Sequence, residues 1–172
     1  MKIRTAKLSD AGGIAKVHVD SWRTTYKNII PGEFLENLSY QSREELWINI
    51  IPQGIVFVAE NDEGQIVGFS SGGKERSGDY KEYQGELSSI YILKEFQGQG
   101  IGKALVKSVI RELGKSGMNT ILVFVLADNN STLFYEAMGG KVIDKIEVEI
   151  AGKKLNELVY GWDTIDTLSG KE

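Results

Sequence analysis

The stretch LSSIYILKEFQGQGIGKALVKSVIRELGKSG, residues 87–117, decides the fold of this chain. It begins with an apolar strand pattern at residues 87–93, passes through the glycine-rich turn QGQGIG and continues as an amphipathic helical pattern that ends at Gly117. A helix that begins in such a turn presents unpaired backbone N–H groups at its positive end, and these attract an anion without any basic side chain. The sequence therefore predicts a phosphate-binding loop between a strand and a helix.

The spacing of this turn excludes two common phosphate-binding motifs. A Walker loop needs a glycine at position 97 and a Ser or Thr at position 104, where this chain has Gln97 and Ala104. The dinucleotide fingerprint GxGxxG needs a third glycine where Lys103 or Leu105 stands. The pattern that remains is Gln/Arg-x-x-Gly-x-Gly/Ala, formed here by Gln97, Gly98, Gln99, Gly100, Ile101 and Gly102.

This pattern resembles the pyrophosphate loop of the Gcn5-related N-acetyltransferase (GNAT) family. Two later segments are similar to the family in the same order. The apolar run TILVFVLAD at residues 120–128 suits a central strand, and NNSTLFYEAMGG at 129–140 resembles the family segment Asn-x-x-x-x-(Phe/Leu)-Tyr-Glu-x-x-Gly. The chain departs from the family at Gly140, where Phe is usual, and in an Asn-to-Tyr spacing that is shorter by one residue.

Residue patterns along the rest of the chain predict one α/β (α+β) domain. Apolar or alternating runs predict strands at residues 1–8, 54–62, 63–73, 87–93 and 120–128 and a hairpin at 141–162. Helical spacing recurs at residues 10–26, at 33–51 with a break near 39–42, at 101–117 and at 129–140. These elements predict a mixed sheet of about seven strands flanked by about four helices. The resemblance implies splayed central strands in a GNAT-like domain of residues 1–162, followed by a dispensable polar tail at 163–172.

The composition excludes several classes of protein. A length of 172 residues with 41% hydrophobic residues suits a single domain. The absence of cysteine and the presence of one histidine, His18, exclude disulfides, a Cys nucleophile and His-rich metal sites. A net charge of -4 gives no basic field for nucleic acid but mildly attracts a cationic amine. Without an apolar signal segment or a membrane-length apolar run, the chain is predicted to be cytoplasmic.

The resemblance also implies where acetyl-CoA binds, and no metal cofactor is expected. The glycine loop and Lys103 would hold the pyrophosphate, with each backbone N–H contributing roughly 1.5 to 3 kcal/mol as a charge-assisted bond. The pantetheine arm would lie along the main chain of Ile90, Tyr91 and Ile92, and a bulge near Ser88 and Ser89 would free the Ile90 N–H to polarise the thioester carbonyl.

Two residue types are candidates for proton transfer. Tyr135 is the candidate general acid, because a phenol of pKa about 10 can protonate a departing CoA thiolate whose thiol titrates near about 8.5. Glu86 is the candidate base for the attacking amine. The structural alternatives are a packing aromatic for Tyr135 and an exposed strand-end carboxylate for Glu86. Asn129 is assigned either to the pantetheine amide or to helix capping, with Asp128 as a rival for the first role.

The acceptor side is predicted from the helix at residues 10–26. His18, Trp22 and Tyr26 recur at helical spacing, and the family position of this helix places them at the border of the acceptor pocket, although core positions explain Trp22 and His18 equally well. The polar segment at 77–85 is expected to be a mobile loop beside a ligand. The resemblance implies an N-acetyltransferase that passes acetyl directly to a primary amine, as a homodimer. The alternatives are an inactive acyl-CoA sensor and, third, a phosphate-loop NTPase.

Overall fold

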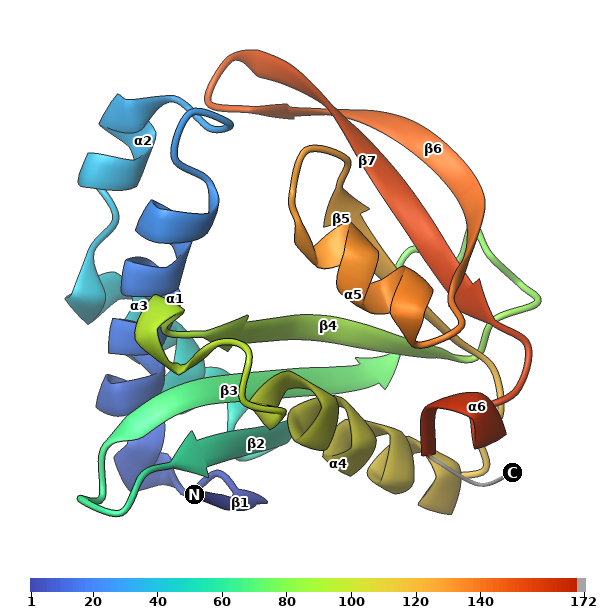
Figure 1. The fold of residues 1–172 in the computed structure, drawn as a ribbon, viewed down its shortest axis with the longest axis horizontal. Helices are drawn as coiled ribbons and strands as arrows, with labels where there is room; N and C mark the ends of the chain where they lie inside the picture. The colour runs from blue at the N-terminus through green and yellow to red at the C-terminus, as the bar shows by residue number, and fades with distance from the viewer. Residues whose placement is uncertain (170–172) are drawn as a thin grey trace.

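The computed structural model describes residues 1–169 and contains one mixed seven-stranded sheet (Figure 1). The strand order is β1-β2-β3-β4-β5-β7-β6, and every neighbouring pair is antiparallel except β4 and β5. The strands are β1 (Lys2–Thr5), β2 (Ile55–Glu60), β3 (Ile66–Lys74), β4 (Gly85–Ile92), β5 (Ile121–Leu126), β6 (Lys141–Ile150) and β7 (Lys153–Trp162). The predicted mixed sheet of seven strands is confirmed.

The described residues contain six α-helices, where the sequence predicted about four. They are α1 (Ala11–Thr25), α2 (Gly32–Glu36), α3 (Tyr40–Ile50), α4 (Ile101–Lys115), α5 (Ser131–Ala137) and α6 (Asp166–Ser169). One additional helix arises because Ser39 divides the segment predicted at residues 33–51. Its hydroxyl accepts the Ser42 N–H at 3.1 Å and begins α3 as an N-cap.

The other additional helix, α6, lies in the segment predicted to be a polar tail. Leu168 is only 2% exposed and belongs to the same core cluster as Leu113 of α4. A Cβ added at Gly114 of α4 would lie 2.8 Å from the Cδ1 atom of Ile165, the residue before α6, so this segment packs closely on α4. Residues 163–169 therefore differ from the expected tail, because Leu168 is buried and Ile165 is half-buried, and residues 170–172 lie outside the described residues.

Helices cover both faces of β3. Ser70 donates its hydroxyl to the Leu105 carbonyl of α4 at 3.1 Å, whereas the next residue toward the N-terminus, Phe69, packs its ring on Trp47 of α3 with centroids 5.0 Å apart. Successive strand residues point to opposite faces, so α4 lies on one face and α3 on the other. A Cβ at Gly72 would lie 2.5 Å from Cγ1 of Val109, which explains the small residue where α4 crosses this strand.

The middle of the sheet opens where β4 and β5 separate. These strands pair only at Gly85 with Ile121 and at Glu86 with Leu122, and Figure 1 shows them diverging beyond that point. On the other side of β4, Ser71 of β3 faces Ser89 while Gly72 faces Leu87, which leaves Ser88 as the extra residue of a β-bulge. Both the splayed central strands and the bulge near Ser88 are confirmed.

The loop at residues 75–84 is joined to the far half of the sheet. The Tyr80 hydroxyl donates to Asp144 of β6 at 2.7 Å, and its ring packs on Phe124 of β5 with centroids 5.8 Å apart. The Tyr83 hydroxyl donates to Asp163 at 3.1 Å. The loop that was expected to be mobile therefore has three contacts that hold it beside the open part of the sheet.

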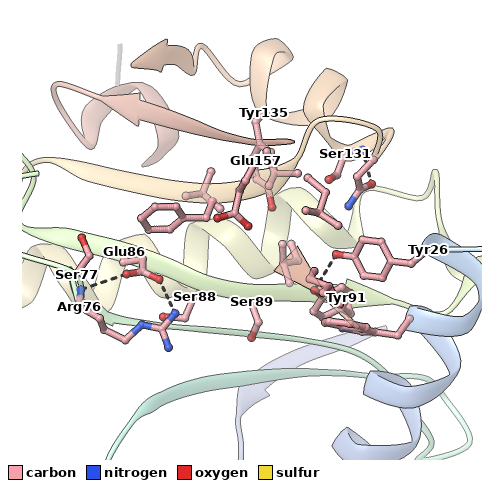
Figure 2. Close-up of a pocket in the computed structure, with 18 residues that line it drawn as sticks. Tyr26, Arg76, Ser77, Glu86, Ser88, Ser89, Tyr91, Ser131, Tyr135 and Glu157 are labelled. Carbon is pink, nitrogen blue, oxygen red and sulfur yellow. Dashed lines mark hydrogen bonds and ion pairs between the residues drawn. The ribbon is translucent and has the colours of Figure 1, made fainter. Parts of the chain in front are cut away.

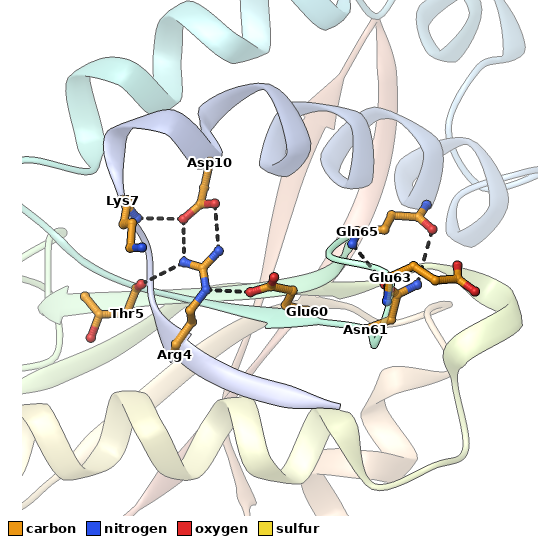
Figure 3. Close-up of polar contacts among 8 residues, drawn as sticks. All are labelled: Arg4, Thr5, Lys7, Asp10, Glu60, Asn61, Glu63 and Gln65. Atoms are coloured by element: carbon orange, nitrogen blue, oxygen red, sulfur yellow. Dashed lines mark hydrogen bonds and ion pairs between the residues drawn. The ribbon is translucent and has the colours of Figure 1, made fainter.

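A partly buried ionic cluster connects β1 to the start of α1 (Figure 3). The guanidinium of Arg4 donates to both carboxylate oxygens of Asp10, at 2.7 and 2.9 Å, and to Glu60 of β2 at 2.7 Å. Asp10 also accepts the Lys7 N–H at 2.7 Å, which closes the 3₁₀ turn Leu8–Asp10 that leads into α1. The hydrogen bond from Arg4 lowers the pKa of Asp10, and the cluster fixes the helix that carries Trp22 and Tyr26.

Candidate active site

Two cavities meet in the gap between β4 and β5. The loop cavity, about 820 Å³, lies beside the glycine-rich turn, and the acidic cavity, about 580 Å³, lies beside Glu86 and is drawn in Figure 2. The residues that line both cavities are Ile90, Tyr91, Asn129, Ser131 and Tyr135. A ligand that enters through the loop cavity therefore meets a ligand held in the acidic cavity at this shared wall.

The loop cavity contains most of the residues predicted to bind the coenzyme. Those that line it are Ile90, Tyr91, Ile92, Gln97, Gly98, Gly100, Gly102, Lys103, Asn129 and Tyr135, together with Asp128. Two predicted residues are absent from its lining. Ile101 is 4% exposed and anchors the loop in the core, as expected, and the Gln99 side chain points instead to the Glu95 carbonyl at 3.5 Å.

The backbone of this loop presents a run of free hydrogen-bond donors. Within the described part of the chain, the N–H groups of residues 98–103 have no hydrogen-bond acceptor, and Gly100 begins the fifteen-residue helix α4 without a side-chain cap. Six adjacent donors at the positive end of a helix favour a bound phosphate. The side chain of Lys103 also lines the cavity.

The loop glycines differ in what surrounds them. Gly98 and Gly100 have φ of 76° and 82°, and a Cβ added at either position meets nothing within 4 Å. Backbone conformation, rather than lack of space, therefore demands glycine at these two positions. At Gly102 an added Cβ would touch Ile92 and Phe134 at 3.4 Å, an ordinary contact distance, so this position is in contact with its neighbours but is not crowded.

Tyr135 combines burial with a free hydroxyl. The residue is 4% exposed, and its ring packs edge-on against Phe134 and Trp162 with centroid distances of 5.3 and 6.2 Å. Its hydroxyl has no hydrogen-bond partner among the described residues, although the residue lines both cavities. Burial raises the pKa of Tyr135 well above its usual value, so the phenol is protonated at neutral pH. The ring contacts agree with the alternative of a packing aromatic, and the position at the wall of both cavities leaves the hydroxyl open to a ligand.

Glu86 is buried and paired. It is 2% exposed, so the alternative of an exposed strand-end carboxylate is wrong. Arg76 donates to it through a guanidinium nitrogen at 2.7 Å and through its backbone N–H at 3.2 Å. Both residues line the acidic cavity, where the Arg76 side chain is 71% exposed and faces solvent.

Sequence reasoning missed a second carboxylate, Glu157 on β7. Glu157 lines the acidic cavity and is partly buried, and it has no ion pair or hydrogen bond with any described side chain. Burial, and then the charge of Glu86, raise its pKa above the usual value. A signal was present in the sequence, because Glu157 shares the strand face of Leu155 and Val159, where a buried β-strand position normally carries an apolar side chain.

Two residues of the shared wall, Tyr91 and Asn129, are held by hydrogen bonds. The hydroxyls of Tyr26 and Tyr91 lie 3.1 Å apart and form a hydrogen bond, and burial raises the pKa of both residues. Asn129 is 8% exposed, and its side-chain oxygen accepts the Ser131 N–H at 2.9 Å, so it caps the start of α5. Its amide group also lies at the wall, so capping and ligand contact are compatible.

Of the three residues predicted to border the acceptor pocket, Trp22 and Tyr26 line the acidic cavity and His18 takes its alternative place among packed side chains. The Trp22 indole nitrogen is buried without a hydrogen-bond partner in the described chain. His18 lines neither cavity. Its Nδ1 atom accepts the Trp47 indole N–H at 3.1 Å, its ring stacks on Tyr91, and burial lowers its pKa to about 4. His18 therefore supports Tyr91 from within the core as a neutral imidazole.

Two further features are absent from the described residues. No group of three or more His, Cys, Asp or Glu side chains among residues 1–169 is arranged to hold a metal ion. None of the helices in that range has both the length and the apolar character that crossing a membrane requires.

Comparison with known proteins relates this geometry to a family. Residues 18–139 match the Acetyltransferase (GNAT) family. The chain is 42% identical over 166 residues to the uncharacterized N-acetyltransferase YuaI of Bacillus subtilis (strain 168), covering 96% of this chain and 95% of that protein. It is 30% identical over 131 residues to the peptidyl-lysine N-acetyltransferase YjaB of Salmonella typhimurium, covering 74% of this chain and 80% of the relative.

The fold is also similar to solved structures. The PaiA N-acetyltransferase of Thermoplasma acidophilum, solved in complex with coenzyme A, superposes with a TM-score of 0.75 at 21% identity, over 93% of this chain and 96% of that one. The sequence match covers more than half of the chain, and the sheet with separated central strands agrees with it. The chain therefore belongs to the GNAT acetyltransferase family.

Proposed function

We propose that this protein is an N-acetyltransferase that moves the acetyl group of acetyl-CoA directly to a primary amine. The observation that carries the proposal is the meeting of the two cavities at Tyr135, with the unpaired N–H groups of residues 98–103 in one cavity and carboxylates in the other. The family and the relatives named N-acetyltransferase support the reaction type. The PaiA structure with coenzyme A supports the identity of the donor.

In this proposal the loop cavity holds the coenzyme. The free N–H groups of residues 98–103 bind the pyrophosphate, and Lys103 adds a positive charge beside it. The pantetheine arm runs along Ile90, Tyr91 and Ile92 into the gap that β5 leaves open. The bulge at Ser88 supports a role for the Ile90 N–H as the donor that polarises the thioester carbonyl.

Tyr135 is proposed as the general acid. The amine nitrogen attacks the thioester carbon, the new C–N bond forms, and the C–S bond breaks to release a thiolate. The Tyr135 phenol is protonated, has no hydrogen-bond partner among the described residues and lines both cavities, so it is available to give its proton to the sulfur. No cysteine is present to form an acyl-enzyme, which agrees with direct attack.

The acceptor is proposed to be a cationic primary amine held in the acidic cavity. Its lining combines aromatic rings with two carboxylates and one guanidinium, so an ammonium group brings the charge of these groups to zero. The peptidyl-lysine specificity in the name of one relative agrees with an alkylamine. A cytoplasmic location and a homodimer stay predictions, which cell fractionation and light scattering of the purified protein test.

The test is a turnover screen with the variant Tyr135→Phe. CoA release is measured with acetyl-CoA and a panel of polyamines, aminoglycosides, amino acids and lysine peptides, and acetyl-CoA affinity is measured by calorimetry. We expect turnover with at least one amine, and a kcat of Tyr135→Phe that is about 100-fold lower with acetyl-CoA affinity within about twofold of wild type.

The matched control is Tyr160→Phe, because Tyr160 contacts the Tyr135 ring at 6.0 Å but lines neither cavity. Its kcat should stay near that of wild type. A protein that binds acetyl-CoA and acetylates no amine is instead an acyl-CoA sensor. Stabilisation by ATP and not by acetyl-CoA contradicts the proposal altogether.

A further inference from the structure

We infer that Glu157, rather than Glu86, is the carboxylate that binds the ammonium group of the acceptor and removes its proton; this inference rests on the proposed function. The two residues approach the acidic cavity from opposite sides of the open sheet. Glu86 lies on β4, and Glu157 lies on β7, opposite Leu126 of β5. Figure 2 shows both carboxylates directed into the space between these strands.

The two carboxylates differ in whether their oxygens already have a hydrogen-bond donor. Arg76 occupies both oxygens of Glu86, one through its backbone N–H at 3.2 Å and the other through its guanidinium at 2.7 Å. Glu157 has no such donor among the described residues, so both of its oxygens remain available to an ammonium group. A base must reach the proton it removes, and a carboxylate that is already paired with a guanidinium is a weaker base.

The charges around Glu157 favour a cation at the same place. The titratable groups around it are Glu86 and Tyr91 on β4, Arg76 and Tyr80 in the 75–84 loop, Tyr26 at the end of α1 and Tyr135 on α5. Asp144 of β6 is bonded to Tyr80 and adds a further negative charge on that side. Arg76 is thus the single positive group facing the site among the described residues, and Glu86 pairs with it. An ammonium group is therefore the ion that relieves the uncompensated charge of Glu157.

The proton balance of the reaction fits these positions. The ammonium group carries three protons, of which one stays on the amide nitrogen of the product. Glu157 takes the first proton that leaves and passes it to solvent, so that the nitrogen lone pair can attack the thioester carbon. The proton that leaves after attack restores the Tyr135 phenol, which has protonated the CoA thiolate. Burial and Glu86 raise the pKa of Glu157 toward that of its proton donor, which improves a carboxylate as a base.

The experiment compares Glu157→Gln, Glu86→Gln and the control Glu149→Gln in the full-length protein. Glu149 lies exposed on β6 and lines neither cavity. The measurements are kcat against pH with an alkylamine acceptor, and the same with 2,2,2-trifluoroethylamine, which is largely neutral at pH 7 and needs no base before attack. Calorimetry with acetyl-CoA and thermal melting report the coenzyme site and the fold.

With the alkylamine we expect Glu157→Gln to lower kcat about 100-fold and to remove the acidic limb of the pH profile. With trifluoroethylamine the loss should be about tenfold smaller, and acetyl-CoA affinity should not change. Glu86→Gln should keep the acidic limb, and Glu149→Gln should behave as wild type. Glu157→Asp retains a carboxylate and should restore the acidic limb, which separates chemistry from damage to the fold.

Three results overturn the inference. Wild-type kcat and pH dependence in Glu157→Gln would do so while leaving the proposed function intact. Loss of the acidic limb in Glu86→Gln would assign the base to Glu86. A wild-type protein that releases no CoA with any amine would overturn the proposed function and this inference together.

Discussion

The loop cavity and the acidic cavity are built in different ways. In the loop cavity the free backbone donors are contiguous, since the N–H groups at 98–103 belong to one turn and the start of one helix. The acidic cavity is made by side chains from α1, the 75–84 loop, β4, β5 and β7. A site made of adjacent backbone groups is fixed by local sequence, whereas a site made of distant side chains depends on how the whole sheet is assembled.

The largest expected effect is a loss of folding stability in acid at the wall that the two cavities share. Because this wall belongs to both cavities, its loss weakens both of them. His18 stacks on Tyr91 and accepts the Trp47 N–H, so a second proton on its ring breaks a buried contact. The folded pKa is about 4 and the unfolded value is about 6.5, so the unfolded chain binds the proton more readily. The neutral His18 ring therefore stabilises the folded state fully above pH 6.5. As the pH falls from 6.5 toward 4, the free energy of unfolding falls by about 3 kcal/mol.

Urea unfolding between pH 7 and pH 4 measures this effect. His18 is the one histidine of the chain, so no other imidazole titrates in that window. His18→Asn, whose side-chain oxygen can accept the Trp47 N–H, should flatten the pH dependence. An equal slope in wild type and in His18→Asn would show that the shared wall does not depend on this residue. The raised pKa of Glu157 acts in the opposite direction, because its protonated form is favoured in the folded state.

The sequence predicted the loop cavity more completely than the acidic one. The turn at residues 97–102 is a local pattern, and its strand and helix neighbours follow from periodicity. Glu86 and Glu157 are far apart in the sequence and come together only because β7 inserts beside β5. A single sequence also gave no sign that Arg76 pairs with Glu86, that Trp47 bonds His18 or that Leu168 is buried, because each contact joins separate elements.

A second prediction tests whether the acidic cavity is independent of the loop cavity. Arg76→Ala removes the charged partner of the buried Glu86 carboxylate. We expect the free energy of unfolding to fall by about 1 to 2 kcal/mol, because Glu86 stays buried while Arg76 itself is largely exposed. The KM for the amine should change about fivefold in either direction, with acetyl-CoA affinity unchanged. The control is Arg111→Ala on α4, which lines neither cavity.

A change in acetyl-CoA affinity on Arg76→Ala would contradict the separation of the two cavities. Steady-state kinetics with the amine varied, calorimetry with acetyl-CoA and urea unfolding give the three quantities. No change in any of them would mean that the ion pair drawn in Figure 2 contributes nothing to the site.

The smallest expected effect compares two glycines at opposite ends of α4. Gly100 begins the helix with φ of 82° and Gly117 follows its end with φ of 83°, and an added Cβ meets nothing within 4 Å at either position. Alanine should therefore cost about 1 kcal/mol of stability at both positions through backbone strain alone. Only Gly100→Ala should also weaken acetyl-CoA binding, by about tenfold, because relief of that strain turns the N–H groups of the loop away from the pyrophosphate. Thermal unfolding measures the loss of stability, and calorimetry measures the loss of acetyl-CoA affinity. Equal acetyl-CoA affinities in Gly100→Ala and Gly117→Ala would mean that coenzyme binding tolerates a rearranged loop. The loop cavity would then not depend on its backbone donors, and the contrast with the acidic cavity would fail.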